Sequence, residues 1–146
     1  SIIRRFHSNI FFVESGATIG CNYECKNINI NGHEIKLNFW DINCQYPDSG
    51  AQLMYCKGAC AAVIAFSFDS FDFTLEVAKQ LKKIVDENIF TSDKKPIPCI
   101  LVANKVDLLP EEDLLENTEK VKKIFDENNF INYFITSAKT GQNIYH

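Results

Sequence analysis

The chain has 146 residues, about the length of one domain, and 46% of them are hydrophobic, as in globular proteins. No apolar run approaches the roughly 18 residues of a membrane-spanning helix. The formal net charge is −4 and the basic residues are scattered, so no nucleic-acid face is expected. We therefore predict a single soluble domain over residues 1–146.

The N-terminal third predicts a helix end followed by a β-hairpin. Residues 1–8 resemble the last turns of an amphipathic helix. Residues 22–30 and 33–40 flank Asn31-Gly32, which favours a type I′ turn between antiparallel strands. In the second strand Ile35, Leu37 and Phe39 alternate with polar residues, so one face of the hairpin should be polar.

The rest of the chain alternates between helix and strand. After a loop at residues 41–50 we predict a short helix through Tyr55, a buried strand at 61–66, a helix at 75–89, a strand at 99–103, a helix at about 112–127 and a strand at 133–135. The helix at 75–89 carries one apolar stripe, formed by Leu75, Ala78, Leu81, Val85 and Ile89. This order predicts an α/β fold with a mainly parallel sheet.

The cysteines lie in or beside apolar segments and have no paired CxxC spacing. They are Cys21, Cys25, Cys44, Cys56, Cys60 and Cys99. We expect buried free thiols in a reducing compartment. A metal site built from Cys21, Cys25, Cys56 and Cys60 is an alternative, but CxxxC on a strand would need a turn that the sequence lacks.

Asn104-Lys105-Val106-Asp107 follows directly on the strand at 99–103 and points to guanine. The Asp107 carboxylate can accept hydrogen bonds from the N1–H and the exocyclic amino group of guanine, whereas adenine has no donors there. We expect Asn104 to donate toward the base or to brace neighbouring loops, and the Lys105 stem to lie along the base plane. A polar cap after a strand is the alternative.

Thr136-Ser137-Ala138-Lys139 ends the next predicted strand and would flank the same base. The small side chain of Ala138 lets its backbone N–H approach the guanine carbonyl, and the Lys139 stem can cover the second face of the base. Together with Ser137, these residues complete the predicted base site.

The ordered motifs resemble those of the Ras-like small GTPases and, within them, of the Rab family. The segments that carry the resemblance are the two loops above, Thr18-Ile19-Gly20, Ile19 to Tyr23 (similar to IGxxF), Lys36 to Trp40 before Asp41, Gln45, and Tyr55 to Ala59 (similar to YYRGA). Asp41-Ile42, Ala103 to Lys105 and Phe130 to Phe134 are similar to the subgroup that serves lysosome-related organelles. The resemblance implies a P-loop NTPase-like, Ras-type sheet with flanking helices.

The resemblance also implies roles for residues near the phosphates of GTP or GDP. Thr18 would coordinate Mg²⁺ and contact the γ-phosphate, Asp41 would hold the metal, and Gln45 would orient the attacking water. The backbone N–H of Cys44 stands where the family donates to the γ-phosphate. Loss of these contacts after hydrolysis would relax the loops, as in an order-to-disorder switch.

Partners and location follow from the same resemblance. Exchange factors, GTPase-activating proteins and effectors would bind through the Thr18 loop and the loop at 41–50. Membrane association, on the cytosolic face of endomembranes, would require a lipidated tail that the sequence does not contain.

Several positions depart from the family pattern. No GxxxxGK[ST] phosphate loop precedes Ser1, and the last helix is missing, so we expect a truncated domain that by itself lacks GTPase activity. The first strand of the family lies between the hairpin and the strand at 61–66, so we expect a gap there and a tendency to aggregate. Cys44 replaces the usual Gly, and Ser67 replaces the usual Asp.

Two functional hypotheses remain open from the sequence, besides an unrelated doubly wound signalling domain. The first is a Rab-like GTP/GDP switch in vesicle traffic. The second is a degenerate module of the same fold that binds partners without cycling, which Cys44 and the missing phosphate loop favour.

Overall fold

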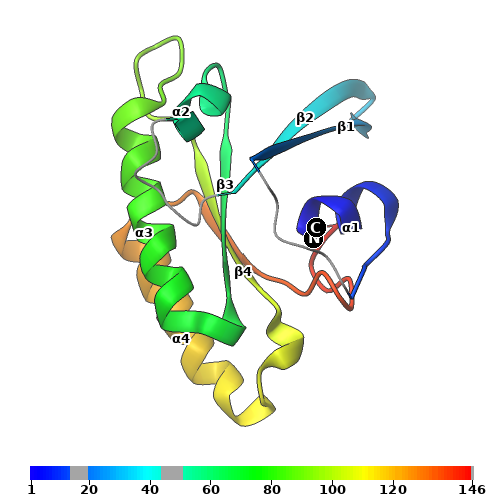
Figure 1. The fold of residues 1–146 in the computed structure, drawn as a ribbon, viewed down its shortest axis with the longest axis vertical. Coiled ribbons are helices and arrows are strands. Elements are labelled where there is room, and N and C mark those ends of the chain that lie inside the picture. The colour runs from blue at the N-terminus through cyan, green and yellow to red at the C-terminus, as the bar shows by residue number, and fades with distance from the viewer. Residues whose placement is uncertain (14–19, 44–50, 146) are drawn as a thin grey trace.

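The computed structural model describes residues 1–13, 20–43 and 51–145, apart from the side chains of residues 51 and 52 (Figure 1). The elements in chain order are α1 (Ile2–Ser8), β1 (Cys21–Ile30), β2 (His33–Ile42), α2 (Ala51–Cys56), β3 (Ala62–Ser67), the single turn η1 (Phe68–Ser70), α3 (Phe71–Asn88), β4 (Cys99–Asn104), the single turn η2 (Val106–Leu108), α4 (Glu111–Glu127) and β5 (Asn132–Ile135). Every predicted helix and strand is present. The main shift is at α3, which begins four residues before the predicted start.

The hairpin forms as predicted. Strands β1 and β2 pair antiparallel, with Ile30 opposite His33, so only Asn31 and Gly32 make the turn. Both turn residues have positive φ, 52° and 84°, as a type I′ turn requires. The apolar face of β2 is only partly buried: Leu37 and Phe39 are half-buried, whereas Ile35 is exposed.

The second sheet is parallel, in the order β3-β4-β5, and holds the core. Leu101 and Ala103 on the central strand β4 are fully buried. Successive parallel strands joined by right-handed crossovers carry their helices on one face, and Figure 1 shows α3 and α4 on the same side of this sheet. Leu75 and Ala78 of the predicted α3 stripe pack into this core. The α/β fold with a parallel sheet is therefore confirmed.

The two sheets are separate. Within the described ranges no strand lies between β2 and β3, which agrees with the expected gap at this place. The total accessible surface is 9838 Å², whereas a compact monomer of 16.7 kDa exposes about 7,600 Å². Val63 on β3 is one of the apolar residues that stay exposed.

The hairpin packs against α1 rather than against the parallel sheet. The Lys26 ammonium donates to the carbonyl of Phe6 at 2.5 Å, and the ring of Phe6 lies 5.7 Å from that of Phe39. The other end of the chain reaches the same helix, since the Tyr145 hydroxyl donates to the Arg5 carbonyl at 2.8 Å. Figure 1 accordingly shows both termini beside α1.

The thiols are less buried than predicted. Of the cysteines in the described ranges, only Cys99 is buried, and burial raises the pKa of its thiol. Cys25 and Cys60 are exposed, so the expectation of buried thiols was wrong for them. Neither residue belongs to the buried core, which β3, β4, α3 and α4 form.

Lys82 on α3 is a buried charge that the periodicity did not predict. The residue is 4% exposed, and its ammonium lies 2.5 Å from Asp86 Oδ2, one helical turn further on. The same ammonium lies 5.3 Å from the centre of the Phe130 ring. An ion pair and an aromatic face thus compensate the loss of hydration.

None of the helices in the described part of the chain is long and apolar enough to cross a membrane.

Candidate functional site

The two predicted base loops are tied together by Asn104, the last residue of β4. Its side-chain Oδ1 accepts hydrogen bonds from the Thr136 hydroxyl at 3.2 Å and from the Ala138 backbone N–H at 3.1 Å. Backbone bonds add to this link, because the N–H of Thr136 donates to the Ala103 carbonyl and the N–H of Val106 to the Thr136 carbonyl. The loops that follow β4 and β5 therefore form one unit at the carboxyl edge of the sheet.

Asp107 is held by the loop that follows β5. Lys105 adopts a left-handed conformation with φ 66°, which turns the chain from β4 into the single turn η2 that carries Asp107. The Ser137 hydroxyl donates to Asp107 Oδ1 at 2.5 Å, and Lys139 Nζ lies 3.8 Å from Asp107 Oδ2. A carboxylate has about four acceptor positions, so Asp107 keeps room for further donors.

Ser137 is itself completely buried, which explains how it can fix the carboxylate. Its hydroxyl oxygen also accepts the N–H of Thr140 at 3.1 Å. One buried hydroxyl thus joins the backbone of its own loop to Asp107 of the other loop.

Lys105 extends toward β3. Its ammonium lies 2.6 Å from Oδ2 of Asp69, in the single turn η1 that follows β3. The other oxygen of this carboxylate accepts the Ser67 hydroxyl at 2.5 Å. The hydrogen bond from Lys105, followed by that from Ser67, holds the pKa of Asp69 below its ordinary value. Asp69 was not among the predicted site residues.

The structure thus brings together all six predicted base-site residues, namely Asn104, Lys105, Asp107, Ser137, Ala138 and Lys139. The alternative in which Asn104 braces the loops is what the hydrogen bonds show. The N–H of Ala138 is engaged by Asn104, so a guanine carbonyl would have to share or displace that bond. The role of each residue toward a base stays a prediction.

The predicted phosphate-side residues are less completely defined. Thr18, Cys44 and Gln45 lie outside the described residues. Asp41 is partly buried on β2, opposite Asn22, and so belongs to the other sheet. Its carboxylate is a suitable ligand for Mg²⁺, which takes one or two carboxylates together with phosphate oxygens. Across the described ranges no group of three or more His, Cys, Asp or Glu side chains is placed to hold a metal ion.

A cluster of aromatic side chains on the hairpin and α2 was not predicted. The ring centres of Tyr23 and Trp40 are 5.0 Å apart, those of Trp40 and Tyr55 are 6.4 Å apart, and all three residues are about half exposed. The signal was present in the sequence, because the turn at Asn31-Gly32 puts Tyr23 directly opposite Trp40. We call these three residues the aromatic patch.

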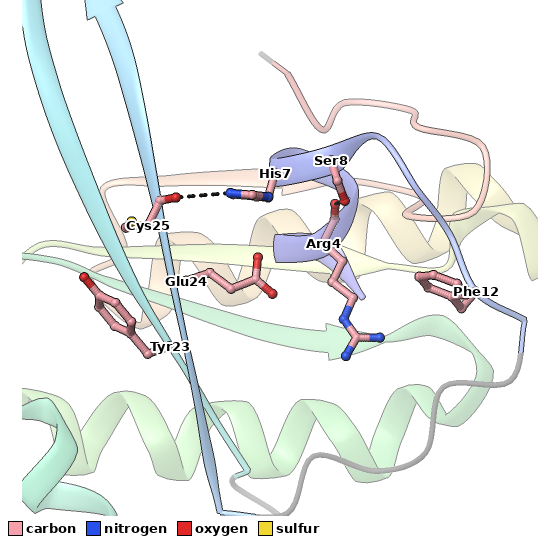
Figure 2. A pocket seen from close by; sticks show the side chains of 7 residues that line it. All are labelled: Arg4, His7, Ser8, Phe12, Tyr23, Glu24 and Cys25. Carbon is pink, nitrogen blue, oxygen red and sulfur yellow. Dashed lines mark hydrogen bonds between the residues drawn. The ribbon is translucent and has the colours of Figure 1, made fainter.

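An open hollow of about 530 Å³ lies between α1 and β1 (Figure 2). Arg4, Phe12 and Glu24 line it, and the Arg4 guanidinium lies 5.8 Å from the centre of the Phe12 ring. His7 Nε2 donates to the Cys25 carbonyl at 3.1 Å across its side. No predicted site residue of the described part lines this hollow, so it is distinct from the base loops.

Comparison with known proteins gives a consistent result. A family model described as the Ras family matches residues 1–146. The Ras-related protein Rab-32A of Dictyostelium discoideum is 36% identical over 99% of this chain and 66% of its own length. The human Ras-related proteins Rab-32 and Rab-7L1 are 31% and 28% identical over 99% of this chain, and 63% and 70% of their lengths are covered. The chain thus spans slightly less than two thirds of the length of Rab-32A and of human Rab-32.

Proposed function

The chain belongs to the Ras family, as a member of its Rab branch, and on that premise we propose that it is a GTP/GDP-binding switch that regulates vesicle traffic. The observation that carries this proposal is the junction of two loops through Asn104, with the Asp107 carboxylate fixed beside it by Ser137. A rigid acceptor at the carboxyl edge of a parallel sheet suits the donor edge of guanine.

The discrimination against adenine would come from Asp107. Guanine offers N1–H and an exocyclic amino group, so both donors can meet a charged acceptor. Adenine has no donor at the corresponding ring position, and a partly buried carboxylate would then lose hydration without gaining a partner. The stems of Lys105 and Lys139 would cover the faces of the base.

For the phosphates, the proposal rests on the sequence. Thr18, Asp41 and the backbone of Cys44 would face Mg²⁺ and the γ-phosphate, and Gln45 would orient the water for hydrolysis. A bound Mg²⁺ would supply charge neutralisation between the phosphate oxygens. Residues 1–146 would act as one domain in this reaction.

For partners, we propose exchange factors, GTPase-activating proteins and effectors that contact the Thr18 loop and the loop at 41–50. The aromatic patch supports a protein partner at the hairpin and α2, because aromatic residues dominate binding energy at interfaces. A lipidated tail would hold the protein on the cytosolic face of endomembranes.

Calorimetry of the full-length protein with Mg²⁺ and GDP, GTP or ATP tests the proposal. We expect GDP and GTP to bind and ATP to bind at least about a hundredfold more weakly, because the partly buried Asp107 carboxylate is unpaired with adenine. Equal affinity for guanine and adenine nucleotides would refute it. Guanine-selective binding without any turnover of GTP would instead favour the non-cycling module.

A further inference from the structure

An ion pair links the ends of β3 and β4 beside the base loops. Lys105 Nζ lies 2.6 Å from Asp69 Oδ2, and the two residues are 36 positions apart in the chain. The Ser67 hydroxyl donates to the second oxygen of the same carboxylate at 2.5 Å. Both oxygens of Asp69 are therefore engaged, one by a cation and one by a neutral donor.

The direction in which the Lys105 side chain extends matters, because β4 lies between β3 and β5 in the sheet. Asp69 draws Lys105 toward the β3 side of the sheet. Lys139, which follows β5, lies on the other side with its ammonium 3.8 Å from Asp107. The two lysines are thus paired with different carboxylates, Lys105 with Asp69 and Lys139 with Asp107.

We propose that Asp69 is a positioning residue for guanine binding, which fixes the Lys105 stem as one wall of the base slot. This inference rests on the proposed function. Asp69 does not touch the base in this account and acts only through Lys105.

The physical benefit is preorganisation. A free lysine side chain has several rotatable bonds, and ordering it when the base arrives would weaken binding. The carboxylate fixes the ammonium in advance and leaves the apolar stem as the contact surface. It also keeps the Lys105 charge paired, so this cation does not compete with the base donors for Asp107.

Ser67 makes this arrangement possible. The family that the chain resembles usually has Asp at this position, and a second carboxylate beside Asp69 would repel it. A serine hydroxyl instead donates to Asp69 and holds it in place. The low pKa of Asp69 agrees with a permanently charged partner for Lys105.

Solvent exposure of the ion pair limits how much Asp69 can change the affinity for GDP. The Lys105 and Asp69 side chains are 46% and 38% exposed, so solvent weakens their attraction. We therefore expect a change of about two- to fivefold in affinity, as is typical of exposed pairs with good geometry.

A double-mutant cycle in the full-length protein tests the inference, with GDP and Mg²⁺ as the ligand and ADP as the reference. Asp69→Asn should raise the dissociation constant for GDP about two- to fivefold. In a Lys105→Met background the same substitution should have no further effect, because the partner through which it acts is gone. Asp72→Asn, an acid three residues further on, is the matched control and should leave GDP binding unchanged.

The outcomes distinguish the positioning role of Asp69 from the proposed function. An Asp69→Asn effect that persists undiminished in the Lys105→Met background, or no effect at all in the parent protein, overturns the positioning role. If the unmutated protein does not prefer GDP to ADP, the proposed function fails and the inference fails with it.

Discussion

Replacing Asn104 with alanine should loosen the two base loops at their junction. Asn104 is 6% exposed, and the two residues that donate to it, Thr136 and Ala138, are 3% and 2% exposed. Truncation removes the acceptor for both donors in a region that water reaches poorly. The substitution therefore removes a link between distant parts of the chain as well as a side chain.

The size of the effect follows from these two bonds. A buried donor left without an acceptor costs about 1–3 kcal/mol. The Thr136 hydroxyl can rotate toward another acceptor, whereas the Ala138 N–H is fixed by the backbone, so we expect a total loss of about 2–4 kcal/mol. Typical domains have about 5–15 kcal/mol in total, so the loss would be easily measured.

Urea unfolding followed by far-ultraviolet circular dichroism is the appropriate assay. The single tryptophan, Trp40, lies in the hairpin and would report on the wrong sheet. Asn117→Ala is the matched control, since Asn117 is a partly buried α4 residue whose side-chain amide donates to the Asp113 carbonyl within its own helix and joins no distant segment of the described chain. The control should cost about 0.5 kcal/mol or less. If Asn104→Ala costs no more than the control, Asn104 does not join the loops.

Three further predictions concern the core, the thiols and the switch. Asp86→Ala should cost about 2–3 kcal/mol in urea unfolding, because Lys82 stays buried without its carboxylate, and adding Lys82→Met should restore most of this; a double variant as unstable as the single one would contradict the reasoning. An alkylating reagent at neutral pH should modify exposed Cys25 well before Cys99, whose pKa is raised by burial, and equal rates in mass spectrometry would count against the packing. Cys44→Gly should speed single-turnover GTP hydrolysis if the switch is only weakened, whereas an unchanged rate would favour the non-cycling module.

Much of the fold was predictable because local and tertiary preferences agree. The turn at Asn31-Gly32 needs positive φ at two successive residues, and few other dipeptides tolerate that. The apolar run in β4 is buried on both faces, so its pattern has only one reasonable interpretation. The base loops were predictable because Asn104 to Asp107 and Thr136 to Lys139 each follow a strand, and parallel strands end at the same edge of a sheet.

The remaining features depend on contacts that periodicity does not encode. Lys82 is buried because Asp86 and Phe130 both meet its ammonium, and only one of these is near in sequence. The contact between Asp69 and Lys105 depends on the pairing of β3 with β4, since the two residues are 36 positions apart in the chain. The exposure of Cys25 follows from the uncovered face of the hairpin, which a short apolar pattern does not predict.

The most direct test of guanine recognition is a change of base preference at Asp107. Asparagine would keep one acceptor for N1–H but present a donor to the exocyclic amino group of guanine, while xanthine has a carbonyl at that position. Calorimetry of the full-length protein should show that Asp107→Asn lowers the affinity for GDP by about a hundredfold or more and raises that for xanthosine diphosphate. If the variant binds GDP as tightly as the parent protein does, Asp107 does not read the base and the account is wrong.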